Sequence, residues 1–473
     1  MHFGLNDCNY YTLKELDEKY WLTRKRIRQI ECKSLRELQY LSKSNELSSC
    51  LQGICLMNIN RAPFLKIAGI TLTIILLGGI FFLRVMQNYE QQDYLNSNFF
   101  TFWLTGRMEL TGDNPYDQTQ YLEGHDAAGA TWKPNQIFPY PLPLSLFMIP
   151  LGLLSLSNAY IAWQLASLVI IATTVLVVLS HWKEPAQRRL LVPMMVFLLF
   201  FGPEYRTLQI GSIGAFALIV VLISLLLFEK EKPILAGTVL SLTFLKPPQG
   251  LTILLLAVIW FLARKDWKAI LGVAFGGLAL LVIGMIQDPL WVVKFISASQ
   301  AVMDRSQGIQ SNVWGYSFLI CKQKLPCSTI LGGGGALTLL GLGSLFLWRN
   351  RTQLSVWDAF NVIIPIGFVS TIYLWSYDQI LYIIPITWIV GTLVERKKRY
   401  IQAFIFMAVL ILTSFISLVL QAYTLKNIWS LGNTVIVLGM VCWLLYLKQK
   451  KPLNDCSEVS NKRDTGEGRL TRK

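Results

Sequence analysis

Four basic side chains in segments with few other cations are the residues best suited to chemistry. They are Arg107, Arg206, Lys246 and Arg305. Arginine and lysine donate charge-assisted hydrogen bonds, and both commonly bind phosphate groups. Lys246 stands beside two prolines in LKPPQG (245–250), between two short apolar segments. If those segments enter a membrane, a charge between them is costly and is usually retained for function. The alternative is an ordinary external turn with a snorkelling lysine. The pattern predicts an anion site at a membrane edge, with Arg107 and Lys246 as first candidates and Arg206 as second.

Several uncharged or acidic groups occupy similar positions and could complete such a site. Candidate substrate-binding residues are Gln209, Tyr116, Tyr377 and Asp378. For the last two, the alternative is an interfacial aromatic residue followed by a solvated acid.

Composition indicates the kind of element that must position these groups. Of the 473 residues, 53% are apolar and only 15% are charged, against about 25% charged in soluble domains. This excludes a disordered chain and argues against an ordinary soluble enzyme. Apolar runs of membrane-spanning length recur along the sequence. The net charge of +15 comes largely from short basic blocks between those runs, which is typical of cytoplasmic loops rather than nucleic-acid binding.

The runs predict an all-α polytopic membrane protein with about 12 transmembrane helices, the first at 67–86. The proline-rich stretch 138–154 is expected to be re-entrant, because proline disrupts helices and irregular backbone survives in a membrane only when it is covered. This topology puts the loop 87–137 outside and both termini in the cytoplasm. We expect a cytoplasmic helical extension at 1–62, a membrane domain at 63–448 and a disordered basic tail at 449–473, in the inner or plasma membrane.

The cysteines and histidines indicate no metal centre. Eight cysteines and three histidines form no cluster with metal-ligand spacing. We therefore expect neither a metal nor another cofactor. Cys321 and Cys327 fall in an expected external loop, where they could form a disulfide.

Five segments together resemble glycosyltransferase family 87, of the GT-C class. They are NFFTFWLTGRMELTGDNPYD (98–117), FPYPLPLSLFMIPLGLL (138–154), LQIGS, LKPPQ and LWSYDQ. The resemblance covers about 64–447. It implies a GT-C fold and an inverting hexosyltransferase that uses a polyprenyl-phosphate sugar, typically mannose. The partners would be that donor, a lipid or glycan acceptor, and the bilayer.

Such a transfer needs a carboxylate base to take the acceptor proton. The resemblance places the family's base at Asn98, and an asparagine cannot perform that role. Asp93 is the first alternative, although on a continuous helix it would be rotated by about 140° from Asn98. Asp113 is the second alternative. Asp117 is a further one, but its position after a turn predicts a helix cap in the first place. Another base, or an inactive enzyme, remains open, as does a lipid-linked sugar transporter or flippase, which needs no base.

Residues 11–53 resemble the C-terminal helix-turn-helix of sigma-70 type sigma factors, chiefly in LTRKRIRQIECKSLREL (22–38). The resemblance implies DNA contacts from Arg24, Arg26, Arg28 and Gln29. Two departures oppose this: Asp17 replaces a small packing residue, and Lys25 replaces a glutamate that would accept a hydrogen bond from cytosine. We expect a degenerate segment with no nucleic acid partner. A membrane-tethered DNA-binding regulator is the alternative.

Overall fold

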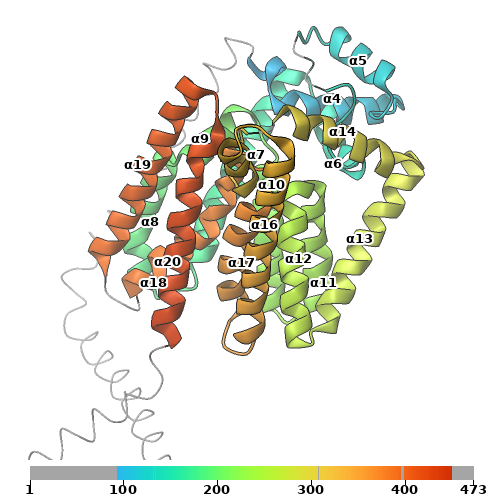
Figure 1. Cartoon of the computed structure of the whole chain (residues 1–473). Helices are drawn as coiled ribbons and strands as arrows, with labels where there is room; N and C mark the ends of the chain where they lie inside the picture. Colours follow the sequence, from blue (N-terminus) through green and yellow to red (C-terminus); the bar gives the residue numbers. More distant parts are fainter. Residues whose placement is uncertain (1–92, 132, 134, 307, 396–398, 450–473) are drawn as a thin grey trace, which may run out of the picture. The chain divides into compact units, whose positions relative to one another are not determined.

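Long apolar helices make up most of the chain that the computed structural model describes, which is residues 93–131, 133, 135–306, 308–395 and 399–449. All of them belong to one unit, Leu76–Lys473. These residues form helices and no strand (Figure 1). The extension 1–62, the span 67–86 and the tail from residue 450 lie outside the described residues.

Seven helices in the described residues are long and apolar enough to cross a membrane. They are α7 (Leu156–Leu179), α12 (Pro247–Arg264), α13 (Trp267–Gln287), α16 (Leu325–Arg349), α18 (Ile383–Glu395) with the 3-10 turn η3 (Ser376–Tyr382) before it, α19 (Tyr400–Thr424), and α20 (Leu431–Gln449) with η4 (Asn427–Ser430). The helices α8 (Glu184–Phe200) and α9 (Gly202–Gln209) form an eighth candidate, bent by 58°. The all-α polytopic membrane fold is confirmed.

Four shorter apolar helices account for much of the difference from the expected 12 spans. They are α6 (Pro143–Gly152), α10 (Gly214–Glu229), α11 (Pro233–Ser241) with η2 (Leu242–Leu245), and α17 (Val356–Ser370). Proline at the first helical position starts α6, α11 and α12, because its missing N–H is not needed there. The same prolines cut the apolar runs into short pieces.

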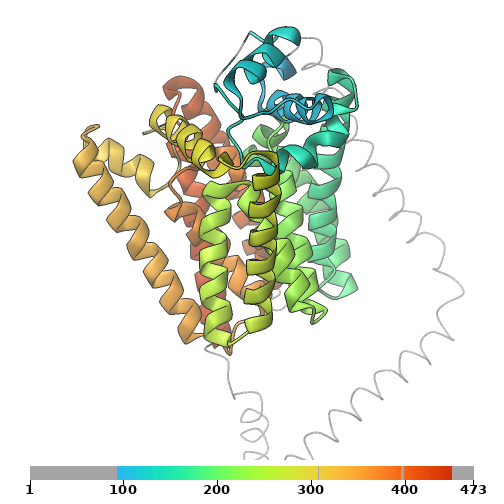
Figure 2. The ribbon, with the colours of Figure 1, turned by 90° about the vertical axis from the view of Figure 1, so that its right-hand side faces the viewer.

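A layer of helices covers one end of the long ones. It contains α4 (Asn98–Thr111), α5 (Gln118–Ala127), α6 and α14 (Trp291–Arg305), as both views show (Figures 1 and 2). The sequence predicted an external loop at 87–137 and another that contains Cys321 and Cys327. The structure instead forms helices there, including η1 (Asp93–Asn96) and α15 (Val313–Ile320). Cys321, which follows α15, and Cys327, in the first turn of α16, form the disulfide that their positions allowed.

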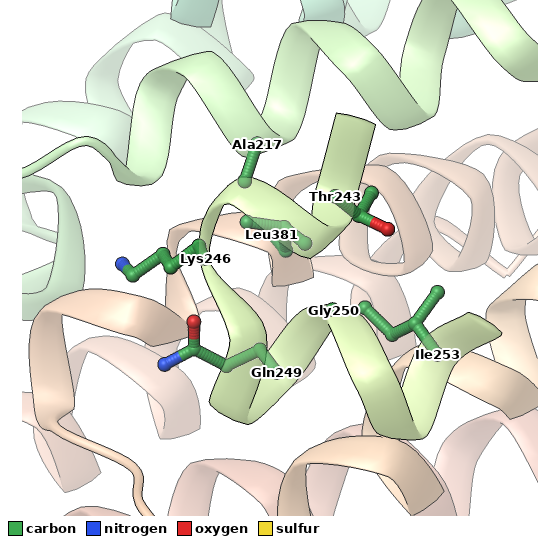
Figure 3. Close-up of a pocket in the computed structure, with 7 residues that line it drawn as sticks. All are labelled: Ala217, Thr243, Lys246, Gln249, Gly250, Ile253 and Leu381. Carbon is green, nitrogen blue, oxygen red and sulfur yellow. The ribbon is translucent and has the colours of Figure 1, made fainter. Parts of the chain in front are cut away.

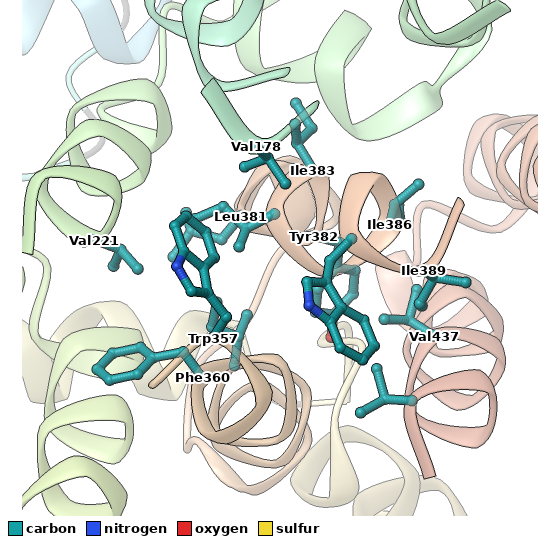
Figure 4. Packing of buried hydrophobic residues seen from close by; sticks show 14 of the residues in the cluster. Val178, Val221, Trp357, Phe360, Leu381, Tyr382, Ile383, Ile386, Ile389 and Val437 are labelled. Atoms are coloured by element: carbon teal, nitrogen blue, oxygen red, sulfur yellow. The ribbon is translucent and has the colours of Figure 1, made fainter. Parts of the chain in front are cut away.

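The core lies around α17 and α18 (Figure 4). The span that contains α18 is 94% buried, whereas the corresponding figure for α16 is 22%. A helix that is apolar all round lies either in a protein interior or against lipid, and its burial places α18 in the interior. The rings of Trp357, Phe360 and Tyr382 fill this core together with aliphatic residues of α7, α10 and α20. Most residues of η3 and α18 are therefore enclosed by other helices.

Ionic contacts tie the helices at the end away from α4. Asp358, at the start of α17, pairs with Lys448 of α20 at 2.6 Å. The neighbouring Trp357 donates a hydrogen bond to Glu229 at the end of α10 (2.6 Å). Arg264, in the last turn of α12, donates to the carbonyl of Leu354 (3.4 Å). The basic blocks in the described residues thus lie at one end and the helical layer at the other.

Glycines bring α11 and α13 into backbone contact. A Cβ on Gly272 would lie 2.1 Å from the carbonyl oxygen of Ile234, and one on Gly237 would lie 2.2 Å from that of Ala269. Small residues permit this close approach between membrane helices. The contact sets the position of α11 and therefore of η2, which leads directly to Lys246.

Gly272→Ala should destabilise the fold by about 1–3 kcal/mol, because the added methyl group must push α11 away from α13. Gly277→Ala is the matched control on the same helix, since a Cβ there meets nothing within 4 Å. That change should stabilise the helix by about 0.5–1 kcal/mol. Thermal unfolding of the purified proteins measures both effects. Equal shifts would contradict the close-packing argument.

Candidate functional site

Lys246 sits at the break between two apolar helices. The turn η2 ends at Leu245 and α12 begins at Pro247, so Lys246 is the residue before the helix. The residue is only 8% exposed, and its ammonium forms an ion pair with Asp378, which is 1% exposed. The structure therefore buries an opposite charge from η3 against the lysine of LKPPQG.

Further contacts hold both partners of this pair. The second carboxylate oxygen of Asp378 accepts a hydrogen bond from the backbone N–H of Trp375 (2.8 Å). The Nζ of Lys246 lies 3.5 Å from the hydroxyl of Ser212 and 5.3 Å from the ring centre of Tyr377. A cation over an aromatic face gains electrostatic stabilisation. Groups from three separate segments thus surround one charge pair.

The first turn of α4 joins this cluster. The side chain of Asn98 is hydrogen-bonded to Tyr377. The next residue, Phe99, donates its backbone N–H to the carbonyl of Ile210 (3.3 Å). Gly211 makes this possible, since its φ of +62° and its contact with the Phe99 side chain leave no room for a Cβ. The position at which the family resemblance placed the base is therefore beside the Lys246–Asp378 pair.

The helix α9 borders the same cluster. Thr207 donates its hydroxyl hydrogen bond to the carbonyl of Tyr377 (2.8 Å). One residue earlier, Arg206 donates to the side chain of Gln209 (2.7 Å), and Gln209 is exposed. Of the predicted site residues, the structure gathers Lys246, Tyr377 and Asp378 directly, with Arg206 and Gln209 on the adjoining helix.

The other candidates with described side chains lie elsewhere. Arg107 is exposed; it is nine residues after Asn98, about 14 Å along α4 and about 180° around it. Asp113 is exposed and accepts a hydrogen bond from Thr111 (2.5 Å). Tyr116 is buried and donates to the carbonyl of Tyr140. These three belong to the helical layer rather than to the Lys246 cluster.

Some predicted residues cannot be placed at all. Asp93 begins η1, a separate turn from α4, so it does not share a helix with Asn98; its side chain and that of Arg305 are outside those described. The DNA-contact candidates also lie outside the described residues. Asp117 does cap α5, as expected, by accepting from the N–H of Gln120 (3.0 Å).

Sequence reasoning missed Gln249, Ser212 and Trp375 as neighbours of the cluster. A cavity of about 10 Å³, room for about one water molecule, lies beside Lys246 and Gln249 (Figure 3). Its other lining residues are Ala217, Thr243, Gly250, Ile253 and Leu381. The only signal for Gln249 was its place in LKPPQ, one helical turn after Lys246.

A second polar cluster holds the layer together. Glu109 accepts hydrogen bonds from Ser145 of α6 and from Gln287 of α13 (2.7 Å). Burial raises the pKa of Glu109, and these two hydrogen bonds offset the effect only in part. Nearby, Asp288 pairs with Lys294 at 2.6 Å. Burial alone would raise the pKa of Asp288, but hydrogen bonds, chiefly from Lys294, lower it.

The fold and the cluster define a polytopic membrane protein with a buried lysine–carboxylate site at one end of its helices. The family model of glycosyltransferase family 87 matches residues 138–369, about half of the chain. This confirms the resemblance to that family and supports a membrane glycosyltransferase. The matched residues include Lys246, while Asn98 and Asp378 lie outside them. No solved structure matches the chain significantly.

A separate likeness covers an N-terminal segment. Over 52 residues the chain is 44% identical to RNA polymerase sigma factor SigA of Listeria monocytogenes, and over 51 residues it is 45% identical to that of Clostridium acetobutylicum. Each match covers 11% of this chain and 14% of the relative. The sigma-factor resemblance is confirmed as a short local one, and DNA contact by this segment stays untested.

Lys246→Met and Asp378→Asn should each destabilise the protein by about 3–5 kcal/mol, because each leaves one buried charge unpaired. The double variant should recover most of that loss, since it removes both charges and the asparagine still accepts from Trp375. Thermal unfolding of the four proteins gives the coupling free energy. Additive losses would show that the pair is not a stabilising unit.

Glu109→Gln should stabilise the protein more at pH 8 than at pH 5. A carboxyl whose pKa is raised in the folded state contributes stability that is fully present below its ordinary pKa and is lost as pH rises through the raised value. Glutamine stays neutral throughout, so this loss disappears. The check is the melting temperature at both pH values, with the exposed Glu123→Gln as control. A pH-independent difference would count against a buried acid at Glu109.

Proposed function

We propose that this membrane glycosyltransferase transfers a hexose, typically mannose, from a polyprenyl-phosphate donor to a lipid or glycan hydroxyl at the external face. The observation that carries the proposal is the buried Lys246–Asp378 pair at the helix end beneath α4. A cation kept at that depth suits a phosphate that is attached to a membrane lipid. The family match supports the transferase class.

The orientation follows from the basic blocks. Short loops rich in lysine and arginine remain in the cytoplasm, and in the described residues these lie at the end away from α4. The Lys246 cluster therefore faces outward in this proposal, with both termini of the chain in the cytoplasm and the protein in the inner or plasma membrane.

The transfer is a single displacement with inversion. The acceptor oxygen bonds to the anomeric carbon, the bond from that carbon to the phosphate oxygen breaks, and polyprenyl phosphate leaves with the electron pair. Lys246 stabilises the charge that develops on this phosphate, with Arg206 and Gln209 nearby. A carboxylate accepts the hydroxyl proton. We favour Asp93 over Asp113 for this role, since Asp113 follows the far end of α4, about 20 Å from Asn98.

The test is transfer from radiolabelled polyprenyl-phosphate mannose in membranes that contain the full-length protein. The Lys246→Met/Asp378→Asn double variant should fold but lose kcat/KM by at least about 100-fold, as expected for removing a group that stabilises transition-state charge. Asp93→Asn should reduce kcat by about 100-fold or more, and Asp113→Asn should have little effect.

Lys294→Met is the matched control, because that lysine also pairs with an aspartate but belongs to the helical layer. It should retain transfer within a few-fold of the unaltered protein. Undiminished transfer by the folded double variant would refute the assignment of Lys246. Absence of transfer by the unaltered protein would refute this donor.

A further inference from the structure

Gln249 is a buried amide whose donor has no partner. The residue is 4% exposed, and its Nε2 makes no hydrogen bond among the described residues. Such an unpaired buried group costs about 1–3 kcal/mol, so native proteins rarely keep one without a reason. Figure 3 shows the Gln249 and Lys246 side chains extending to the same side from the start of α12.

The backbone at this point adds to the same positive potential. Helix α12 runs for 18 residues from Pro247, and its dipole places partial positive charge at the first turn. Its first two residues are prolines, which carry no N–H, so Gln249 supplies the first backbone donor of the helix as well as a side-chain donor. Backbone donors at helix N-termini commonly bind anions.

The ammonium group of Lys246 also has a hydrogen-bond donor that no described residue uses. An ammonium group offers three donors, and its contacts in the structure are to Asp378 and, at 3.5 Å, to Ser212. A further unpaired donor lies close by: the indole Nε1 of Trp375 is buried without a partner, and its ring stacks on Tyr377 at an interplanar angle of 6°. Gln249 Nε2 and Trp375 Nε1 are both donors, which suits an oxygen-rich anion.

We propose that Gln249 binds a phosphate oxygen of the lipid-linked donor, together with Lys246 and the N-terminus of α12. The inference rests on the proposed function and adds a binding residue to it. Gln249 donates through Nε2 to the phosphate, and Lys246 supplies the charge. In this arrangement Gln249 contributes to binding the donor and its leaving group, and does not take or give a proton.

Gln249→Leu separates this role from a structural one. Because Nε2 has no protein partner, the leucine variant should unfold no more easily than the unaltered protein, while kcat/KM for polyprenyl-phosphate mannose should fall about 10- to 100-fold, the loss expected for one hydrogen bond to a charged group. Gln379→Leu is the control: that buried amide bonds the carbonyl of Ser430 and the side chain of Asn433, so its loss should lower the melting temperature.

A second readout does not depend on turnover. Polyprenyl phosphate alone should raise the melting temperature of the full-length protein, and Gln249→Leu should weaken this shift. Normal transfer by Gln249→Leu, or a loss of stability equal to that of Gln379→Leu, would overturn the inference and leave the proposed function standing. If the unaltered protein transfers no sugar, the proposed function fails. In that case, a rise in melting temperature with polyprenyl phosphate that Gln249→Leu abolishes would still support the binding site. If polyprenyl phosphate does not raise the melting temperature, the inference about the binding site fails as well.

Discussion

The burial of one charge pair constrains the architecture around it. Taking Lys246 and Asp378 out of water is costly, and either charge alone would cost more than the two together. Each partner must therefore be held where the other can reach it. Asp378 lies at the start of the span that is buried on nearly all sides, and Lys246 lies at a proline break whose position depends on the α11–α13 contact.

The helical layer has a different relation to the site. Its residues Asn98 and Phe99 contact the cluster through Tyr377 and Ile210. Tyr116 is buried within the layer, whereas Arg107 and Asp113 lie on its exposed surface. Asn98 occupies a central place but offers an amide, not a carboxylate. The described residues thus contain a defined lysine–aspartate site, whereas the carboxylate base is assigned by the proposal alone.

Much of the fold could be predicted, because a membrane restricts the possible elements. Spans need apolar runs of about 20 residues, and their basic flanks follow a simple rule. The helices α14 and α15 were missed because short interfacial helices leave no run of that length. Among site residues, Lys246 could be predicted because a charged side chain between two apolar segments is costly in free energy. Nothing in the sequence distinguished Gln249, and only the structure showed that its Nε2 is buried without a hydrogen-bond partner.

The sequence by itself determined the class of protein, the seven long spans of the described residues and the isolated lysine at the double proline, since these depend on local hydrophobicity and on the chemistry of proline. It also carried the family resemblance that the match over residues 138–369 confirms. Only the tertiary structure decided that Asp378, more than 130 residues from Lys246, is its partner, and that Arg107 lies outside this site. Pairing across a bundle depends on how helices pack and rotate, and spacing along the chain does not encode it.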